Sequence, residues 1–396
     1  MKRFIKDVDV KGKKVLLRLD LNVPLDEEGN ITDKTRLMES MVTINYLCEH
    51  GAKVIICSHL GRPKGHVNPM YSLKVVADAM DKLSKYKVFF ATDTIGDDAK
   101  SKIENMKDGE IVLLENLRFD SREEENDEEF SHELASLADI YCLDAFGTAH
   151  RKHASTYGVA SLLPSSVGFL IQKELKSAEH ILRNPKRPLL AILGGGKVED
   201  KLPVIENLLN VADIILIGGG MAFTFIKASG GSVGDSKVDE DKVDLAKTWL
   251  ESAREKNVQI VLPLDCVCNT SIDSNDKPVV FNAFDIKDGY MGLDIGRKTT
   301  KLFKKYIKKA NSIIWNGPMG VFEREEYSRG TDKVAKYVAK SKAFTFVGGG
   351  DSVSAVVKMN YSKKINHLST GGGASLMLMS GKSLPCIDNI DEVDNA

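Results

Sequence analysis

The segment LLAILGGGKVEDK, residues 189–201, joins a short apolar run to three glycines and a charged stretch. Other apolar runs rich in Val, Ile and Leu recur along the chain, and the clearest lie at 15–19, 53–57, 111–114, 140–143, 213–217, 259–262, 312–315 and 344–347. Longer amphipathic segments separate them and predict helices, at 35–49, 72–84, 130–138, 172–182, 239–256, 299–309, 331–340 and 352–359. Because parallel strands need long crossover connections, this alternation predicts mostly parallel sheets with helices on both faces.

The length of the chain, 396 residues, predicts two domains, because a single hydrophobic core stops growing at roughly 250–300 residues. A predicted helix that begins at Gln172 is broken by the segment NPKRP, whose two prolines precede a fresh strand. We therefore predict an α/β fold with two doubly wound, Rossmann-like parallel-sheet domains, at 1–171 and 189–375. The helix and linker at 172–188 would join them, with a cleft between the two domains.

The charges of the chain nearly cancel, since 55 Lys+Arg against 56 Asp+Glu give a formal net charge of −1. A general nucleic-acid binder usually carries a clear basic excess, so this balance argues against a nucleic-acid partner. Six cysteines without a CxxC pair are typical of reduced thiols in a cytoplasmic protein rather than of a disulfide or zinc framework. The N-terminal segment has no signal-peptide pattern, and no run of about 20 apolar residues predicts a membrane span.

Four Gly-Gly-Gly triplets distinguish the second half of the chain, at 194–196, 218–220, 348–350 and 371–373. Each follows a predicted strand or strand end and precedes a helix-like segment. Glycine at such a turn lets a ligand approach the backbone, and the first N–H groups of a helix bind anions. Four such turns favour a phosphate-rich ligand, although any single triplet is equally typical of a tight turn. Neither the dinucleotide fingerprint GxGxxG nor a complete P-loop is present in the sequence.

Charged residues flank these glycines. Lys197 and Lys201 are four residues apart, and we expect them on one face of a helix that begins after the first triplet. Asp351 and Ser352 follow the third triplet at an expected helix start. Because Mg²⁺ takes one or two carboxylates together with phosphate oxygens, Asp351 is a candidate magnesium ligand, with a helix N-cap as the alternative. Glu323, in the segment NGPMGVFE after another predicted strand, adds a carboxylate to the same sheet edge.

The first half carries a different set of charged side chains. Five arginines lie near predicted strand ends or in the loops after them, together with His59 and His150: Arg18, Arg36, Arg62, Arg118 and Arg151. A planar guanidinium binds phosphate and carboxylate groups through paired hydrogen bonds. One such arginine is more typical of a surface ion pair, but five at one sheet edge predict a site for a small anion, with Asp20 and Asn22 suited to the hydroxyls of a polyol acid. The two halves together predict phosphoryl transfer between a small anion and a nucleotide.

Ten motifs, in this order, resemble those of phosphoglycerate kinases over essentially the whole chain. They are RLDLNVP (18–24), DKTR (33–36), SHLGRP (58–63), LLENLRF (113–119), DAFGTAHRKHAS (144–155), GGGKVEDK (194–201), GLDIG (292–296), WNGPMGVFE (315–323), VGGGDS (347–352) and STGGGAS (369–375). The resemblance implies the glycolytic, reversible transfer of the acyl phosphate of 1,3-bisphosphoglycerate to Mg·ADP, which gives 3-phosphoglycerate and ATP. It also implies a monomer.

The resemblance assigns roles to individual residues, motif by motif. The N-terminal domain would bind 3-phosphoglycerate through Asp20, Asn22, Arg36, His59, Arg62, Arg118 and Arg151. The C-terminal domain would bind the nucleotide through Lys201, Gly292, Glu323, Gly349, Gly350, Asp351 and Ser352, with Asp351 also holding Mg²⁺. The catalytic set would be Arg36, Lys197 and Gly373, the last at a helix start. In the family the last residues return to the first domain, which predicts that 376–396 packs on 1–171.

The chemistry of this reaction needs no general base, because the glycerate carboxylate and the terminal phosphate of ADP are already ionised near neutral pH. Catalysis then depends on positioning and on charge stabilisation by Arg36, Lys197 and Mg²⁺. We interpret His59 as a substrate-binding donor rather than as an acid or base. Because the motifs for the two substrates fall in separate domains, we expect the domains to close during catalysis.

Two other classes of protein remain as alternatives. A nucleotide-binding scaffold or regulator would keep the glycine triplets but would have no use for Arg36 or Lys197, and both are present. An NAD-dependent dehydrogenase would need the complete glycine fingerprint, which the sequence does not contain. A coupled assay with 3-phosphoglycerate and Mg·ATP separates the three classes.

Overall fold

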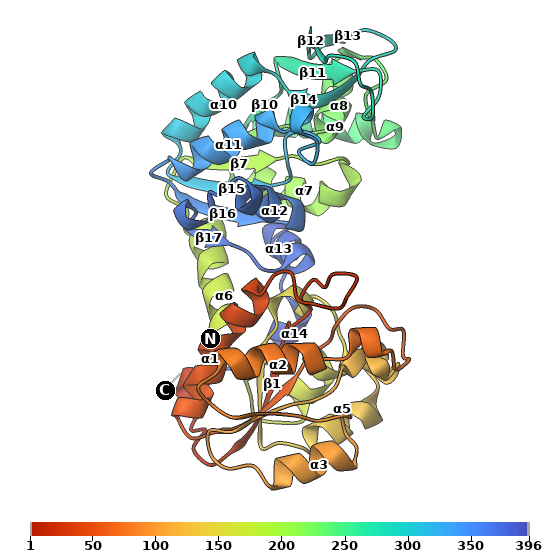
Figure 1. Ribbon diagram of the computed structural model, residues 1–396. Coiled ribbons are helices and arrows are strands. Elements are labelled where there is room, and N and C mark those ends of the chain that lie inside the picture. Colours follow the sequence, from red (N-terminus) through yellow and green to blue (C-terminus); the bar gives the residue numbers. More distant parts are fainter. Residues whose placement is uncertain (1, 394–396) are drawn as a thin grey trace. The chain divides into compact units, whose positions relative to one another are not determined.

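The computed structural model of the chain describes residues 2–393 (Figure 1). Met1 and residues 394–396 lie outside the described residues, so the predictions that the first domain begins at residue 1 and that the tail runs to 396 are not followed there. Within residues 2–393, no helix combines the length and the apolar composition that crossing a bilayer requires.

The chain divides into two compact units. Unit 1 holds the described residues up to Leu175 and from Ser383 onward, and unit 2 comprises Lys176–Lys382. The first division lies inside a helix, α6 (Phe169–Leu182), so this helix belongs partly to each unit. Unit 2 is therefore one continuous stretch of chain, whereas unit 1 is made of two stretches.

Unit 1 is built on a six-stranded sheet in the order β3-β4-β2-β1-β5-β6, in which every neighbouring pair is parallel. Its strands are β1 (Lys14–Leu19), β2 (Lys53–Cys57), β3 (Val88–Phe90), β4 (Ile111–Leu113), β5 (Ile140–Asp144) and β6 (Ser165–Val167). The four central strands are almost completely buried, as continuous apolar runs predict for strands that are covered on both faces.

The two faces of this sheet are covered by different segments. Val15, Leu17 and Leu19 of β1 pack into one core with residues of the first two helices. Since strand side chains alternate, Arg18 points to the opposite face, where it meets the short helix η5. The helices are α1 (Thr35–Glu49), α2 (Lys74–Leu83), α3 (Asp97–Glu104), α4 (Arg122–Glu125), α5 (Glu128–Ala135) and α14 (Pro385–Asp388), with short turns of helix at η1 (Ile5–Asp7), η2 (Pro69–Tyr71), η3 (Leu117–Phe119), η4 (Phe146–Thr148), η5 (Ala154–Gly158) and η6 (Val159–Ser161).

The C-terminal segment of unit 1 is hydrogen-bonded to the N-terminal segment of the same unit. The Cys386 backbone N–H donates to the carbonyl of Ala149 at 3.2 Å, and the Asn389 side-chain amide donates to the carbonyl of Tyr157 at 2.8 Å. Asp391 forms an ion pair with Arg3 at 2.9 Å. These bonds complete unit 1 with residues from the far end of the sequence.

Unit 2 contains a second six-stranded parallel sheet, in the order β10-β8-β7-β15-β16-β17. Its strands are β7 (Leu189–Leu193), β8 (Ile214–Ile217), β10 (Gln259–Val261), β15 (Ser312–Asn316), β16 (Phe344–Gly348) and β17 (His367–Leu368). Residues of β7 alternate between two hydrophobic cores: Leu189 and Ala191 join one, Leu190 and Ile192 the other. The prediction of an α/β fold with two doubly wound parallel sheets is therefore confirmed.

The helices of unit 2 supply both of these cores. The first core takes residues from α7 (Leu202–Val211), α8 (Met221–Ala228), α9 (Val243–Glu255) and α13 (Gly372–Met379). The second takes residues from α10 (Arg297–Lys309), α11 (Arg329–Ala339) and α12 (Gly350–Lys358). Short helical turns complete the unit at η7 (Glu199–Lys201), η8 (Glu240–Lys242), η9 (Glu325–Tyr327) and η10 (Ser362–Lys364).

A five-stranded sheet in unit 2 was not predicted from the sequence. Its order is β14-β11-β12-β13-β9, and its pairs are antiparallel except β13 with β9. The strands are β9 (Ser232–Val233), β11 (Asp265–Asn269), β12 (Val279–Asn282), β13 (Asp285–Ile286) and β14 (Met291–Ile295). These strands are too short and too polar to give a continuous apolar run, and β12 is largely exposed.

The helix expected directly after the first glycine triplet begins later than predicted. Lys197 lies in irregular backbone, Lys201 ends the 3-10 turn η7, and the α-helix α7 begins only at Leu202. Pro203 explains the position of this start, because proline is favoured in the first turn, where its missing N–H costs nothing. The prediction that Lys197 and Lys201 share one helix face is therefore wrong.

Candidate functional site

The predicted substrate residues of unit 1 gather at one edge of its sheet. The strands β4, β2, β1 and β5 are adjacent and parallel, so their carboxyl ends meet at this edge. The segments that follow these four strands carry the candidate residues: Asp20, Asn22, His59, Arg62, Arg118 and Arg151. The strand order therefore places the segments that carry these six residues at one edge of the sheet.

Arg36, in the first turn of α1, is held by the loop after β1. Its Nη1 donates to Oδ1 of Asp20 at 2.8 Å and to the carbonyl of Asn22 at 3.2 Å. The Asn22 side-chain oxygen accepts from the N–H of Gly61 at 2.8 Å. Asp20 and Asn22 therefore fix the positions of Arg36 and of the loop after β2, in addition to any contact with a ligand.

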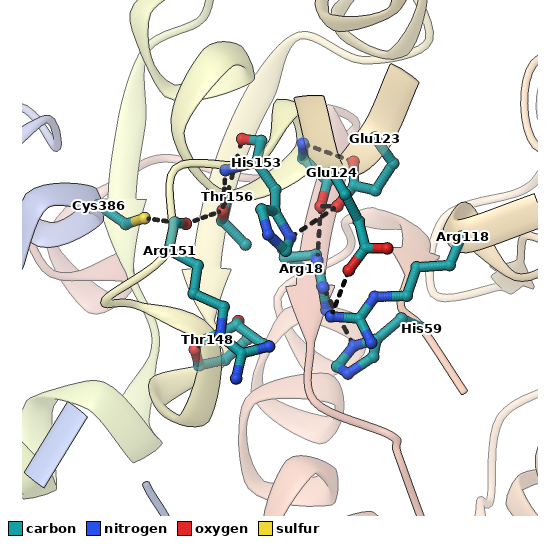
Figure 2. Close-up of polar contacts among 12 residues, drawn as sticks. Arg18, His59, Arg118, Glu123, Glu124, Thr148, Arg151, His153, Thr156 and Cys386 are labelled. Atoms are coloured by element: carbon teal, nitrogen blue, oxygen red, sulfur yellow. Dashed lines mark hydrogen bonds and ion pairs between the residues drawn. The ribbon is translucent and has the colours of Figure 1, made fainter. Parts of the chain in front are cut away.

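His59 and Arg118 are the most buried members of the set, each 4% exposed. Nη1 of Arg118 donates to the carbonyl of Gly61 at 3.0 Å, and its Nη2 lies 3.2 Å from a carboxylate oxygen of Glu124 (Figure 2). Burial, reinforced by Arg18 and Arg118, lowers the pKa of His59 well below its usual 6.5. His59 is therefore a neutral imidazole at physiological pH.

Arg62 and Arg151 differ from Arg118 in being exposed. The side chain of Arg62 makes no hydrogen bond or ion pair with any residue in the described part of the chain. Nε of Arg151 donates to Nε2 of His150 at 3.2 Å. The Arg151 carbonyl accepts from the Thr156 hydroxyl at 2.9 Å and from the Cys386 thiol at 3.0 Å (Figure 2). These two guanidinium groups are available to an anion.

Arg18 does not belong to this exposed set. The sequence places it near a strand end, and we expected it at the loop edge with the other arginines. It lies inside β1 and is only 1% exposed, because side-chain alternation turns it under the sheet. Its neighbours are Ser155 and His59, and it also donates to the carbonyl of Leu19.

Unit 2 contains a pocket of about 560 Å³ at the carboxyl ends of its parallel strands. Gly195 and Gly196 after β7, Gly220 after β8 and Pro318 after β15 contribute to its wall. Gly219 shows why bare glycine is needed: a Cβ there would lie 2.6 Å from the backbone N of Gly195. The glycine triplets therefore fit both the ligand-site and the tight-turn interpretation, since glycines line the pocket and also let the loops pack closely on one another.

Three of the predicted nucleotide residues line this pocket: Gly292, Glu323 and Asp351. Gly292 lies against the ring of Phe223, also a pocket residue, so closely that a Cβ would overlap it. The other four predicted nucleotide residues are not in the pocket wall: Lys201, Gly349, Gly350 and Ser352.

Lys201 is 9% exposed, and its Nζ would lie 3.7 Å from a Cβ built on Gly195, a pocket residue. Burial lowers the pKa of Lys201, while the nearby Asp200 and Asp351 oppose that shift. Ser352 is buried, and its hydroxyl accepts from the N–H of Gly317 at 2.5 Å. Gly349 has φ of 90° and precedes α12, whose first residue is Gly350.

The remaining catalytic candidates of unit 2 are exposed. Lys197 lies between β7 and η7, and Gly373 lies in the first turn of α13. The first N–H groups of α13 have no partners inside the helix, so they can donate to an anion. Asp351 occupies the first turn of α12, and no side-chain bond caps that helix, so the alternative interpretation of Asp351 as an N-cap is not supported.

Several pocket residues were missed by sequence reasoning. Phe223, Asp235 and Lys237 line the pocket, and the Lys237 Nζ would lie 3.4 Å from a Cβ built on Gly196. Lys237 follows an edge strand of only two residues, β9, so neither periodicity nor a glycine motif marks it. A basic residue in a short GDSK turn was the only available signal.

The charged side chains offer little for a resident metal cluster. Within residues 2–393, no group of three or more His, Cys, Asp or Glu side chains is arranged to hold a metal ion, and all six cysteines are free and buried. A single carboxylate such as Asp351 suits a cation that arrives with phosphate oxygens of its own.

Comparison with known proteins identifies relatives over nearly the whole length of the chain. A family profile described as phosphoglycerate kinase matches residues 5–382. Curated phosphoglycerate kinases of Clostridium kluyveri and Finegoldia magna are 51% and 52% identical over 393 residues, covering 98% and 99% of both chains. Among solved structures, phosphoglycerate kinases of Coxiella burnetii and Pyrococcus horikoshii align over 98% of both chains, with TM-scores of 0.89 and 0.82 and identities of 37% and 35%.

Proposed function

The chain belongs to the phosphoglycerate kinase family, and from this premise we propose how its own residues carry out the family's reaction. That reaction is the glycolytic, reversible transfer of a phosphoryl group from 1,3-bisphosphoglycerate to ADP, which gives 3-phosphoglycerate and ATP. The chain is a phosphotransferase with a carboxyl group as acceptor. The residue roles, the metal and the motion below are our proposals.

We propose that the basic edge of unit 1 binds the glycerate substrate. The gathering of cationic side chains after four adjacent strands is the observation that carries this assignment. Arg62 and Arg151 are exposed and suit the phosphate, while neutral His59 donates one hydrogen bond. Arg36, anchored by Asp20, suits the carboxyl end, where the phosphoryl group is transferred.

The pocket of unit 2 is the proposed site of ADP and ATP. Its volume of about 560 Å³ and its glycine-lined wall suit a nucleotide whose phosphates lie on backbone N–H groups. Asp351 fits the role of a magnesium ligand, because its exposed carboxylate stands in the first turn of α12 beside this pocket. Bound Mg²⁺ would neutralise phosphate charge there. Gly350 and Ser352 would contribute backbone N–H groups from the same helix start.

The transfer itself requires positioning and charge stabilisation. The attacking carboxylate is already ionised, so no side chain has to remove a proton. Arg36 and Lys197 supply positive charge to the transferring phosphoryl group, and the first N–H groups of α13, including that of Gly373, donate to its oxygens. His59 cannot act as a strong acid at neutral pH, because burial and its cationic neighbours keep it neutral.

We propose that catalysis includes a closure of the two units. The acceptor and donor residues belong to different units, and in-line transfer needs the reacting oxygens within a few ångströms. Small-angle scattering of the protein with both substrates, compared with each substrate alone, should show a smaller radius of gyration. An unchanged radius would rule out closure as a step of the reaction.

The activity is tested by a coupled assay. The protein with 3-phosphoglycerate and Mg·ATP should form 1,3-bisphosphoglycerate, which an added dehydrogenase converts with oxidation of NADH. Omission of Mg²⁺ should abolish the signal, and Asp351→Asn should raise the Mg²⁺ concentration that half-maximal activity requires. Full activity in a chelator, or unchanged magnesium dependence in Asp351→Asn, would contradict the proposed metal site. We further propose a monomer in the cytoplasm with small-molecule substrates and without nucleic-acid or membrane partners.

A further inference from the structure

A network of buried polar groups extends from His59 through Arg18 to Glu123 (Figure 2). Arg18 of β1 is 1% exposed, and Ser155 of η5 and Glu123 of α4 are completely buried. None of these three residues is required by the mechanism described above. Charged groups are rarely buried so completely unless they are paired, so the arrangement calls for a functional reason.

The hydrogen bonds of this network that link Arg18 to Glu123 are all donated in the direction from Arg18 toward Glu123. Nε of Arg18 donates to the Ser155 hydroxyl at 2.7 Å, and that hydroxyl donates to Oε1 of Glu123 at 2.6 Å. The Ser155 N–H donates to the other carboxylate oxygen of Glu123 at 3.0 Å. Because a guanidinium can only donate, the Ser155 oxygen must accept from Arg18 and its single proton must go to Glu123.

At the other end of this network, Arg18 contacts the imidazole of His59. Nη2 of Arg18 lies 3.3 Å from Nδ1 of His59. Since Arg18 has no acceptor to offer, Nδ1 must be the unprotonated nitrogen. The proton of the neutral ring is then on Nε2, which is the nitrogen left to donate to a bound ligand.

We propose that Glu123 is a positioning residue that, through Ser155 and Arg18, holds His59 as the Nε2–H tautomer, ready to donate to an oxygen of the glycerate substrate. The inference rests on the proposed substrate site of unit 1. Burial raises the pKa of Glu123, whereas Arg18 and the two hydrogen bonds from Ser155 oppose that shift and favour the carboxylate. As a carboxylate, Glu123 supplies the negative charge that lets Arg18 remain buried and oriented, and Ser155 transmits the orientation. His153, whose Nδ1 lies 3.9 Å from Oε1 of Glu123, does not compete as a cation, because burial lowers its pKa to about 4.

Loss of the Glu123 charge is expected to change the orientation and tautomer of His59 rather than its charge. Removing the Glu123 charge leaves a buried guanidinium without a counter-charge, so Arg18 has to move toward other acceptors. The contact from Arg18 to Nδ1 is then weakened, and the two neutral tautomers of His59 become comparable in population. A ring protonated on Nδ1 instead presents the lone pair of Nε2 to the ligand. That lone pair and an anionic ligand oxygen repel each other, so substrate binding is weakened.

The test measures the tautomer of His59 directly, in the full-length protein. In ¹⁵N spectra of the imidazole, assigned with a His59→Gln variant, the wild type should show a protonated Nε2 and an unprotonated Nδ1. Glu123→Gln and Ser155→Ala should each shift both signals toward a mixture of tautomers. Glu125→Gln, an exposed residue of the same helix, is the matched control and should leave the spectrum unchanged.

Kinetics supply the second readout. In Glu123→Gln and Ser155→Ala the KM for 3-phosphoglycerate should rise about five- to tenfold, while the KM for Mg·ATP stays within about twofold. If Glu123→Gln does not fold, Ser155→Ala still removes the hydrogen-bonded link between Arg18 and Glu123, and its spectrum and KM decide the question. A wild-type ring protonated on Nδ1, or a Ser155→Ala variant with an unchanged tautomer and unchanged KM, overturns the proposal. The spectra need no activity, so a wild type with the Nε2–H tautomer but no kinase activity would instead refute the proposed function.

Discussion

The basic edge of unit 1 and the pocket of unit 2 are both proposed to bind negative charge, but they are built from different chemical groups. Unit 1 uses guanidinium and imidazole side chains, and two of its arginines, Arg36 and Arg118, form ion pairs with Asp20 and Glu124. Unit 2 uses glycine backbone and helix starts, with Lys201 and Lys237 near the glycine loops. The difference implies that unit 1 is vulnerable to the loss of one side chain, whereas unit 2 is vulnerable to the gain of one.

The largest effect is expected from Arg36→Lys in unit 1. An ammonium cannot reproduce the planar fork that reaches Asp20 and the substrate together, so kcat should fall by about 100-fold or more while the fold is retained. Steady-state kinetics and circular dichroism measure the two quantities. Arg254→Lys, at an exposed position in the last turn of α9, should leave kcat unchanged. Near-native kcat in Arg36→Lys would remove this residue from the chemistry.

The two units hold the carboxyl groups near their candidate sites in different ways. Asp20 of unit 1 pairs with Arg36, whereas Asp294 lines the pocket of unit 2 and, within residues 2–393, accepts hydrogen bonds only from backbone N–H groups, those of Ile295 at 2.8 Å and Gly330 at 2.6 Å. Burial raises the pKa of Asp294 to about 7. The folded protein therefore keeps a proton that the unfolded chain releases above about pH 4, so this contribution to stability is lost as the pH rises through 7.

Asp294→Asn removes that titration. Between pH 5 and pH 7.5 the free energy of unfolding of the variant should improve relative to the wild type by roughly 2–3 kcal/mol. Urea unfolding followed by tryptophan fluorescence reports on unit 2, because Trp249 and Trp315 both lie there. Asp288→Asn, at an exposed carboxyl of the same unit, should track the wild type. Parallel pH curves for Asp294→Asn and the wild type would contradict the prediction.

The substitution Gly292→Ala adds a single methyl group to the pocket of unit 2. In Gly292→Ala the new Cβ collides with the ring of Phe223, which has to move within the pocket. The KM for Mg·ATP should rise about tenfold, while the KM for 3-phosphoglycerate stays near its normal value. Equal changes in both KM values would show that the effect is a general loss of structure.

The smallest effect is expected where unit 1 has an exposed carboxylate at its edge. Glu124 is 45% exposed at its side chain and lies 3.2 Å from Nη2 of Arg118. Glu124→Gln removes a competitor for this guanidinium, so the KM for 3-phosphoglycerate should fall about two- to threefold. Glu125→Gln on the same helix provides the matched measurement and should have no effect. A higher KM in Glu124→Gln would mean that the ion pair is needed to orient Arg118.

The parallel sheets could be predicted because buried strands such as β7 are continuous apolar runs, and such runs are visible without knowing their partners. The five-stranded sheet of unit 2 could not, since β9 and β13 have two residues each and β12 is mostly exposed. Their pairing depends on contacts between distant segments. Local periodicity carries no information about such contacts.

The candidate site shows the same limit. The loop residues that follow strands of one sheet could be grouped from the sequence, because parallel strands end at a common edge. Arg18 looked like one of them, yet its burial depends on Ser155 and Glu123, which only the folded chain brings to it. Lys197 and Lys201 do not share a helix face because α7 begins only at Leu202, and Pro203 in its first turn was a local signal of this later start.

The discontinuity of unit 1 has a consequence for the order in which the protein is made. Unit 2 is one continuous stretch, so all of it has been synthesised before Ser383 is added. The bonds from Cys386, Asn389 and Asp391 to the first-made residues form only after that. The half of the molecule that leaves the ribosome first is thus the half that is finished last, and a chain that terminates early would leave unit 1 incomplete with unit 2 intact.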